Sequence, residues 1–369
     1  MSDRLKALYE QCGQSPWLDN LKRSYITSGE LAQIRSSGIR GLTSNPTIFQ
    51  KAIQGSQDYV EQFTDLVKDD KSPLESYWHL VLSDINSALD VFESLYEESN
   101  GQDGFVSVEV DPNLAHDTAK TLTAARQLHL QISRPNAMIK IPATIEGLPV
   151  IKTMISEARN VNVTLIFSLQ RYQQVMNAYL DGLEILAKNS PSLVQTVASV
   201  ASFFISRVDT EIDRQLELST KSEATSLLGT AAINQAKLAY EMFGKTFTGP
   251  RWKNLEKLGA RVQRPLWAST SAKNPKYKDT FYVDNLIGEN TVNTLPDNTV
   301  SAFKDHGVIA QTITKDLDRA HAQWLSLGKL GIDVSDVANR LEREGVSSFQ
   351  KSFDELLDVL GTKAQELSQ

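Results

Sequence analysis

Three segments decide the fold: FVSVEVD (105–111), AMIKIPA (137–143) and NVNVTLIF (160–167). Successive side chains of a strand point to opposite faces of the sheet. In each segment one face is apolar. The opposite faces carry a set of polar residues, namely Glu109, Lys140, Asn162 and Thr164. If helices cover the outside of a closed sheet, these polar faces must point inward toward a common centre.

Five further segments have the composition of strands, and each of the eight is followed by a helical pattern. The five are 16–19, 38–44, 199–206, 262–269 and 290–295. Strands that alternate with helices favour a parallel sheet, because parallel strands need long crossover connections. Eight is the number that closes a (β/α) barrel. We therefore predict an α/β fold, a TIM (β/α)8 barrel, with residues 1–369 forming a single domain.

Two other folds also fit alternating strands. An open doubly wound sheet is disfavoured, because no GxGxxG follows a strand and no GxxxxGK[ST] is present. An antiparallel sheet with one solvated face would show the same alternation. The long helical runs between strands leave few hairpin connections for it.

Capping patterns predict where several helices begin and end. Thr27 with Glu30, and Ser72 with Glu75, have capping-box spacing. The second helix has Pro73 at its first position and should run to about Glu98.

Extra helices are expected at the C-terminus, over about 332–361, packed on the barrel. Apolar residues recur there at helical spacing, namely Phe349, Phe353, Leu356 and Leu360. From this amphipathic pattern we hypothesise that residues 348–361 cover part of the barrel mouth.

Composition excludes several classes of protein. The 369 residues are 41% hydrophobic with a net charge of −7, which argues against a nucleic-acid partner held by a positive field. The single Cys12 and five scattered histidines exclude a cysteine-rich metal site and an HExxH site. No apolar run approaches the ~20 residues of a membrane span. With no signal-peptide pattern at the start, we expect a cytoplasmic protein without membrane contact.

Lys140 is the strongest catalytic candidate. No charged residue lies within three positions of it, and buried lysines are rare unless paired or functional. Burial favours the neutral amine, a nucleophile that forms a Schiff base with a carbonyl. Alternatively, Lys140 extends to solvent from a strand end or pairs structurally with Glu109. Asp19 and Glu109 would supply the proton transfers, although a lone Asp19 is more often a helix cap or a solvated strand end.

A phosphate site is expected after the sixth and seventh strands. Arg207 follows the sixth strand, and Ser269 and Lys273 follow the seventh. Loops after the late strands of barrels often hold phosphate through amides, a helix N-terminus and a cation. Arg207 could instead form an ordinary ion pair with Asp209 or Glu211.

Seven motifs, in order along nearly the whole chain, resemble those of transaldolases. They are WLD (17–19), GLTSNPTIF (41–49), VSVEVDP (106–112), MIKIPAT (138–144), NVTLIFS (162–168), ASFFISRVD (201–209) and WASTSAKNP (267–275). The chain length and TVNTLP (291–296) are similar to the longer bacterial branch of that family.

The resemblance implies a circularly permuted class I aldolase barrel that acts without a metal or an organic cofactor. Such enzymes transfer a dihydroxyacetone unit from sedoheptulose 7-phosphate or fructose 6-phosphate to glyceraldehyde 3-phosphate or erythrose 4-phosphate. This reaction belongs to the non-oxidative pentose phosphate pathway, so the expected partners are small sugar phosphates. Whether the chain forms a homo-oligomer is left open.

Catalytic roles also follow from the resemblance. Lys140 matches the Schiff-base lysine and Asp19 the acid/base, while Glu109 and Thr164 match the pair that activates water. The matching substrate-binding residues are Thr43, Asn45, Asn162, Ser202 and Phe204. The matching phosphate-binding residues are Arg207, Ser269 and Lys273.

Two details bear on specificity. Phe204 stands where related sugar-phosphate aldolases have tyrosine, which favours transfer over simple cleavage. Short transaldolases have a second arginine at the position of Ser271, and the longer branch resembles this chain in having lysine two residues later. Two alternatives remain: an aldolase that releases dihydroxyacetone, and a non-catalytic barrel that binds sugar phosphates.

Overall fold

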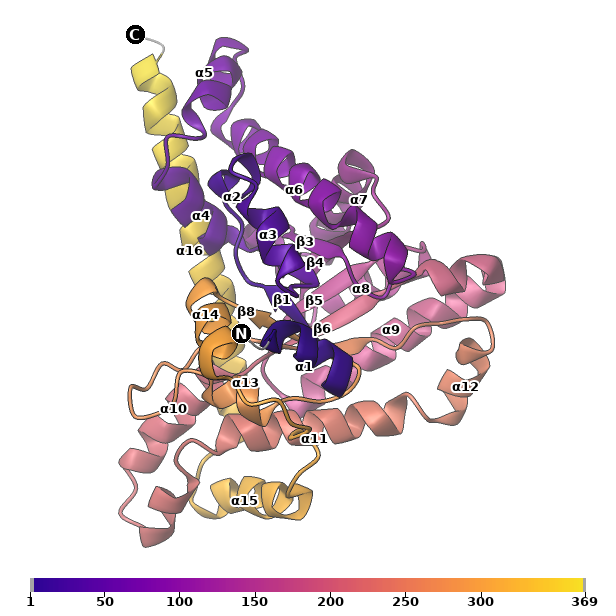
Figure 1. The fold of residues 1–369 in the computed structure, drawn as a ribbon, viewed down its shortest axis with the longest axis vertical. Coiled ribbons are helices and arrows are strands. Elements are labelled where there is room, and N and C mark those ends of the chain that lie inside the picture. Colours follow the sequence, from indigo (N-terminus) through magenta and orange to yellow (C-terminus); the bar gives the residue numbers. More distant parts are fainter. Residues whose placement is uncertain (1–2, 368–369) are drawn as a thin grey trace.

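The computed structural model describes residues 3–367, and its strands form a closed parallel barrel in sequence order, with β8 pairing with β1. Figure 1 shows the helices surrounding the strands. The strands are β1 (Gln14–Leu18), β2 (Gly41–Thr43), β3 (Phe105–Glu109), β4 (Ala137–Pro142), β5 (Val161–Ile166), β6 (Ser199–Phe204), β7 (Arg264–Ala268) and β8 (Thr291–Leu295). The predicted barrel is confirmed, and each strand overlaps the segment expected for it.

Helices connect the strands and extend the fold beyond them. They are α1 (Arg4–Cys12), α2 (Arg23–Thr27), α3 (Glu30–Ser36), α4 (Pro46–Gln54), α5 (Val60–Lys68), α6 (Pro73–Glu98), α7 (Thr118–Ile132), α8 (Gly147–Ser156), α9 (Leu169–Asn189), α10 (Ser206–Glu217), α11 (Ala231–Thr246), α12 (Pro250–Glu256), α13 (Phe281–Asn285), α14 (Asp297–His306), α15 (Leu317–Lys329) and α16 (Val334–Leu367). Short 3-10 helices are η1 (Pro112–Leu114), η2 (Pro191–Thr196) and η3 (Ser222–Leu227). Within residues 3–367, no helix has the length and apolar character of a membrane span.

The strand register brings the inward polar residues side by side. Glu109 is the Cα partner of Lys140, which is in turn the partner of Asn162. Thr164 pairs with Pro142 one layer nearer the carboxyl ends of the strands. Polar side chains predicted on three separate strands therefore form one continuous patch inside the barrel.

Trp17 of β1 fills the barrel interior. It lies two residues before Asp19, so the two side chains point to the same face of the strand. The tryptophan side chain is fully buried. The opposite strand position is Gly41, where a Cβ atom would come within 2.5 Å of the indole ring. The glycine of the GLTSNP motif is therefore required by packing, because any larger residue would displace the tryptophan.

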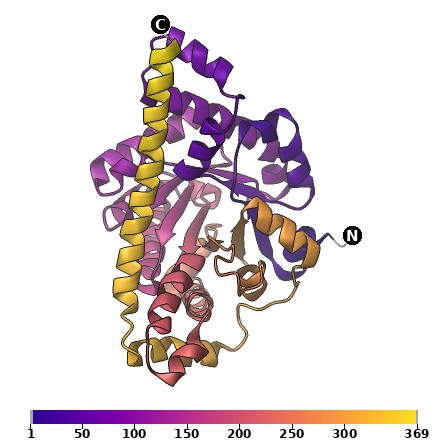
Figure 2. The same cartoon turned by 90° about the vertical axis from the view of Figure 1, so that its left-hand side faces the viewer.

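A single long helix, rather than several helices over 332–361, ends the described chain. The helix α16 has 34 residues and crosses in front of the barrel strands (Figure 2). It is held there by polar contacts with other elements: Ser352 lies 2.8 Å from Thr47 of α4, and Asp354 accepts a hydrogen bond from Asn113 at 2.9 Å. The predicted amphipathic face is buried, including Phe349 and Phe353.

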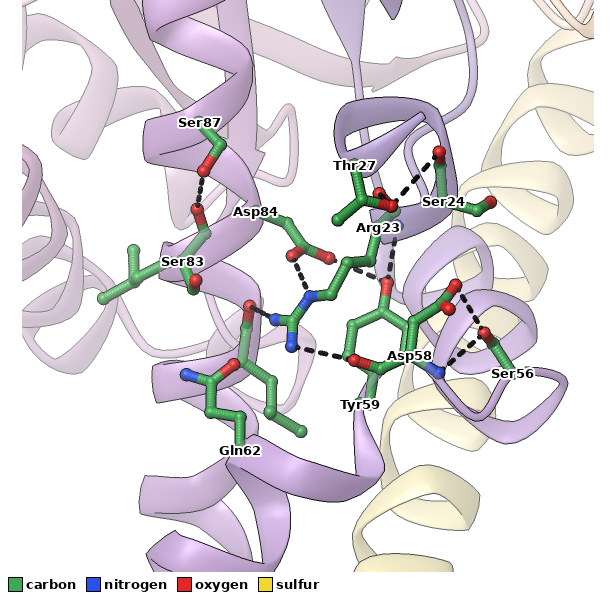
Figure 3. A network of polar contacts seen from close by, with 12 residues as sticks. Arg23, Ser24, Thr27, Ser56, Asp58, Tyr59, Gln62, Ser83, Asp84 and Ser87 are labelled. Carbon is green, nitrogen blue, oxygen red and sulfur yellow. Dashed lines mark hydrogen bonds and ion pairs between the residues drawn. The ribbon is translucent and has the colours of Figure 1, made fainter. Parts of the chain in front are cut away.

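One of the two predicted capping boxes is confirmed. Ser72 caps α6, its hydroxyl accepts from the backbone of Glu75, and the Glu75 side chain accepts from the backbone of Ser72. The prediction for Thr27 is wrong, because Thr27 is the last residue of α2 and its hydroxyl donates back to carbonyl oxygens of that helix (Figure 3). The next helix begins only after Gly29, whose φ of +77° interrupts the helical path.

Candidate active site

A cavity of about 130 Å³ lies at the carboxyl ends of the barrel strands. Ten of the twelve predicted site residues line it, namely Asp19, Thr43, Asn45, Lys140, Thr164, Ser202, Phe204, Arg207, Ser269 and Lys273. The other two, Glu109 and Asn162, contact residues of the lining. Within the described part of the chain, no group of three or more His, Cys, Asp or Glu side chains is arranged to hold a metal ion.

Lys140 is buried and faces the cavity. Its residue is 4% exposed, and Nζ lies 3.2 Å from Oε2 of Glu109. Nζ also donates a hydrogen bond of 3.1 Å to the backbone carbonyl of Ser44. The amine therefore does not extend to bulk solvent. Its ion pair with Glu109 lies at the cavity.

Glu109, the acid that pairs with Lys140, has a shifted pKa. Burial raises the pKa of Glu109 above its ordinary value, and the nearby charge of Lys140 opposes this rise. A carboxylate with a raised pKa is a better proton acceptor for the amine beside it. Thr164 is fully buried nearby, and its hydroxyl has no hydrogen-bond partner among residues 3–367. Such a hydroxyl is available to a ligand or a water molecule.

Asp19 is held at the end of β1 by its neighbours. Its backbone N–H donates to Leu295 at 2.9 Å, and its carboxylate accepts from the hydroxyl of Thr43 at 2.8 Å. Burial raises its pKa, while Lys140 and Thr43 lower it. Asp19 does not cap a helix, because α2 begins after Lys22. The helix-cap alternative is thereby excluded.

The chain that follows Asp19 is fixed to the rest of the molecule by Arg23. The guanidinium donates to the buried carboxylate of Asp84 on α6 at 2.8 Å, and Tyr59 donates to the same carboxylate at 2.7 Å (Figure 3). The Tyr59 hydroxyl also accepts from the backbone N–H of Arg23 at 3.1 Å. Three segments are joined in this way, so the loop that carries Asp19 has little freedom to move.

The two predicted amides occupy different positions. Asn45 lines the cavity and caps α4, since its Oδ1 accepts from the backbone of Ile48 at 3.0 Å. Its Nδ2 makes no hydrogen bond to another residue within 3–367 and is available to a ligand. Asn162 is fully buried, donating to Ser107 at 3.0 Å and accepting from Ser202 at 2.7 Å. It reaches the cavity through Ser202, which does line it.

The predicted phosphate residues meet at the first turn of α10. Arg207 lies in that turn and makes no ion pair with the described carboxylates, and burial lowers its pKa. Glu211 pairs instead with Arg214 and Arg340, so the alternative pairing of Arg207 is excluded. Ser269 approaches Ser206 at the start of α10, with their hydroxyl oxygens 2.8 Å apart.

Lys273 completes this cationic part of the lining from the loop after β7. Its Nζ donates to Ser271 at 2.9 Å. A helix N-terminus with a guanidinium that forms no ion pair with a described carboxylate, and with an ammonium nearby, is a favourable position for a dianion. Ser271, which also lines the cavity, is thus in direct contact with Lys273.

Two polar contributions to the site were not predicted. Thr294 of β8 lines the cavity and lies 2.6 Å from the hydroxyl of Thr43. The backbone carbonyl of Ser44 accepts a hydrogen bond from Nζ of Lys140. Phe349 of α16, which belongs to the segment 348–361 expected at the barrel mouth, also lines the cavity. The alternation of β8 could have indicated Thr294, whereas a backbone carbonyl leaves no signal in a sequence.

Comparison with known proteins agrees with this geometry. The family model described as transaldolase/fructose-6-phosphate aldolase matches residues 16–360. The chain belongs to this family. A transaldolase of Parafrankia sp. is 47% identical over 350 residues, covering 94% of this chain and 95% of the relative. Transaldolase 1 of Streptomyces avermitilis is 46% identical over 95% of this chain and 93% of its own length. A transaldolase of Thermobifida fusca is 47% identical over 96% of both.

Proposed function

We propose that this enzyme transfers a dihydroxyacetone unit from a ketose phosphate to an aldose phosphate through a Schiff base on Lys140. Transferase activity of the transaldolase kind follows from family membership and from the relatives of that name. The observation that carries the residue assignment is the buried contact of Lys140 with Glu109 at the cavity. Fructose 6-phosphate and sedoheptulose 7-phosphate are the proposed donors, and glyceraldehyde 3-phosphate and erythrose 4-phosphate the acceptors.

Formation of the imine requires an unprotonated amine. Glu109 takes a proton from Lys140, which its raised pKa favours, and the amine adds to the ketose carbonyl. The resulting carbinolamine loses its hydroxyl as water when an acid returns a proton. Glu109, with the unpartnered hydroxyl of Thr164, is suited to hold that water.

Cleavage then depends on Asp19. Its carboxylate accepts the proton of the substrate hydroxyl, the adjacent carbon–carbon bond breaks, and the electron pair moves into the iminium to give an enamine. The aldose phosphate leaves, and a second aldose adds by the reverse steps. Asn45, Asn162 and Ser202 keep the three-carbon fragment in position between the two halves of the reaction.

The phosphate of either sugar is proposed to bind at the start of α10. Arg207 and Lys273 supply positive charge there, and Ser269 supplies a hydroxyl. A cytoplasmic location fits such substrates and is part of the same proposal.

Trapping of the covalent intermediate tests the assignment. After incubation with fructose 6-phosphate and borohydride, mass spectrometry should find a reduced dihydroxyacetone adduct on the peptide that contains Lys140. Lys140→Met should form no adduct and lose ~10⁴-fold or more in activity, the scale of losing a nucleophile. The matched control is Lys237→Met, which removes another buried lysine. Lys237 lies on α11, donates to the backbone carbonyl of Lys315 and does not line the cavity. An adduct that persists in Lys140→Met would refute the proposal.

Release of dihydroxyacetone without transfer is the alternative that the family description includes. A coupled assay separates the two activities, because transfer requires an acceptor aldose phosphate and simple cleavage does not. We expect product formation from fructose 6-phosphate to depend on erythrose 4-phosphate. Equal rates with and without the acceptor would favour an aldolase.

A further inference from the structure

We propose that Phe349 of α16 shields the covalent intermediate and so determines how often the dihydroxyacetone fragment is transferred rather than released. This inference rests on the proposed Schiff-base function. It assigns a role to a residue more than 200 positions from Lys140 in the sequence.

The position of Phe349 is fixed by close packing one helical turn earlier. At Gly345, an added Cβ would lie 2.9 Å from a methyl carbon of Leu165. Leu165 itself has a φ of +60° and belongs to a register shift in β5 between Val163 and Ile166. The helix therefore packs directly on the irregular end of β5. Phe349 lies four residues after Gly345, on the same side of the helix.

The ring of Phe349 lies over the reactive amine. Nζ of Lys140 is 5.9 Å from the ring centroid, and the phenylalanine is 4% exposed. Phe349 lines the same cavity as Lys140, and it is the one residue of α16 in that lining. A large apolar side chain at this point keeps water away from one side of the amine.

The next turn of α16 holds this arrangement in place without reaching the cavity. Phe353 packs edge-on against Tyr77 of α6, with ring centroids 4.9 Å apart. Ser352 contacts Thr47, close to the cavity residue Asn45. Phe353 thus packs the helix against α6, whereas Phe349 closes the cavity.

The chemistry needs such a shield because the enamine has two fates. In transfer, its carbon forms a bond with the carbonyl carbon of the incoming aldose. In release, the same carbon takes a proton from water to form a carbon–hydrogen bond. The hydroxide that remains adds to the iminium carbon, the bond to Nζ breaks, and dihydroxyacetone leaves with the lysine restored. One water molecule is lost when the imine forms and one is used when it is hydrolysed. The atoms therefore balance in transfer and in release. Exclusion of water favours transfer.

The test measures this partition in the full chain. With fructose 6-phosphate and erythrose 4-phosphate present, we compare dihydroxyacetone released with sedoheptulose 7-phosphate formed. Phe349→Ala should raise the ratio of release to transfer by about tenfold, a change of ~1.4 kcal/mol between the two barriers. Phe349→Leu, which keeps an apolar side chain, should stay within about twofold of the unmodified enzyme. In D₂O, the released dihydroxyacetone should carry one deuterium on the carbon that was protonated.

Phe353→Leu and Phe353→Ala are the matched controls, because they loosen the same helix outside the cavity. If they change the ratio as much as Phe349→Ala does, packing of the helix explains the effect and the proposal is wrong. Should Phe349→Ala fail to fold, Phe349→Val replaces it and should give a smaller rise. An unmodified enzyme without a borohydride adduct contradicts the Schiff-base function, whereas an adduct with an unchanged ratio in the Phe349 variants contradicts this inference alone.

Discussion

Buried and half-buried acidic residues occur at both ends of the barrel, and they differ in how many partners they have. At the amino-terminal end, Asp103 is fully buried and accepts four hydrogen bonds, from Ser15, Trp17, Arg40 and Arg264. These partners come from β1, from the chain before β2 and from β7, so this one carboxylate joins several strands.

At the carboxyl-terminal end the acids have few partners. Asp19 accepts from Thr43, and Glu109 pairs with Lys140. Burial raises the pKa of both. The same type of side chain thus has its charge compensated by several partners at one end, whereas at the other it has few partners, as suits the catalytic role proposed for it.

Removal of Asp19 should have the largest effect. Asp19→Ala should lower kcat by ~10²–10⁴-fold, the range for loss of a general base, because cleavage needs an acceptor for the hydroxyl proton. The reduced adduct on Lys140 should still form, and mass spectrometry of borohydride-treated enzyme measures it. Loss of the adduct together with kcat would indicate that Asp19 takes part in formation of the imine, in place of or beside Glu109.

Removal of Asp103 should lower the stability of the fold rather than the activity. Asp103→Ala leaves Arg40 and Arg264 without their carboxylate and should lower the free energy of unfolding by about 3–5 kcal/mol. Chemical denaturation measures this loss. The activity of the folded fraction should change little, because Asp103 lies at the opposite end from the cavity. A large fall in kcat at unchanged stability would contradict the division between the two ends.

Replacement of Arg207, at the carboxyl-terminal end, should have a smaller effect, and only on phosphorylated substrates. Arg207→Ala should raise KM for phosphorylated sugars by about 10–100-fold, as expected for hydrogen bonds to a charged group worth ~1.5–3 kcal/mol. Steady-state kinetics with an unphosphorylated ketose is the comparison, and there the change should be slight. Arg214→Ala is a suitable control, because Arg214 lies on the same helix but pairs with Glu211. Equal effects on both substrates would exclude Arg207 from the phosphate site.

Local alternation in the sequence predicted much of this arrangement. In three of the strands it indicated the inward direction of Glu109, Lys140 and Thr164, because a period of two follows directly from strand geometry. The other five strands were predicted from their composition. Together with the family motifs, the alternation predicted ten residues of the cavity lining. The positions of Asp19 and Arg207 followed from the rule that barrel sites form at the carboxyl ends of strands.

Features that depend on tertiary contacts could not be predicted in this way. The register shift in β5 between Val163 and Ile166 leaves no periodic signal, and the placement of Phe349 over Lys140 depends on the path of α16. Thr27 had the correct spacing for a cap, but the backbone at Gly29 delayed the next helix. In each case, contacts or conformations that have no periodic signal decided the outcome.

The smallest expected effect is a rise in the free energy of unfolding when the charge of Asp19, at the carboxyl-terminal end, is removed. Because burial raises the pKa of Asp19, its protonated form is favoured in the folded state. Its contribution to stability is therefore fully present below the unfolded pKa of ~3.9 and is lost as the pH rises through the higher folded value. Asp19→Asn, which removes the charge and can still accept from Thr43, should raise the free energy of unfolding at pH 7 and have little effect below about pH 4.

Denaturation of this variant and of Asp103→Asn, each compared with the unmodified chain at the same pH, gives the most direct comparison of the two ends. The same exchange of carboxylate for amide should be stabilising at Asp19 and destabilising at Asp103, since only Asp103 compensates two guanidinium groups. Destabilisation at both positions would mean that Thr43 and Lys140 compensate Asp19 fully. The low number of partners would then not explain its reactivity, and the raised pKa of Glu109 alone would have to account for proton transfer in the cavity.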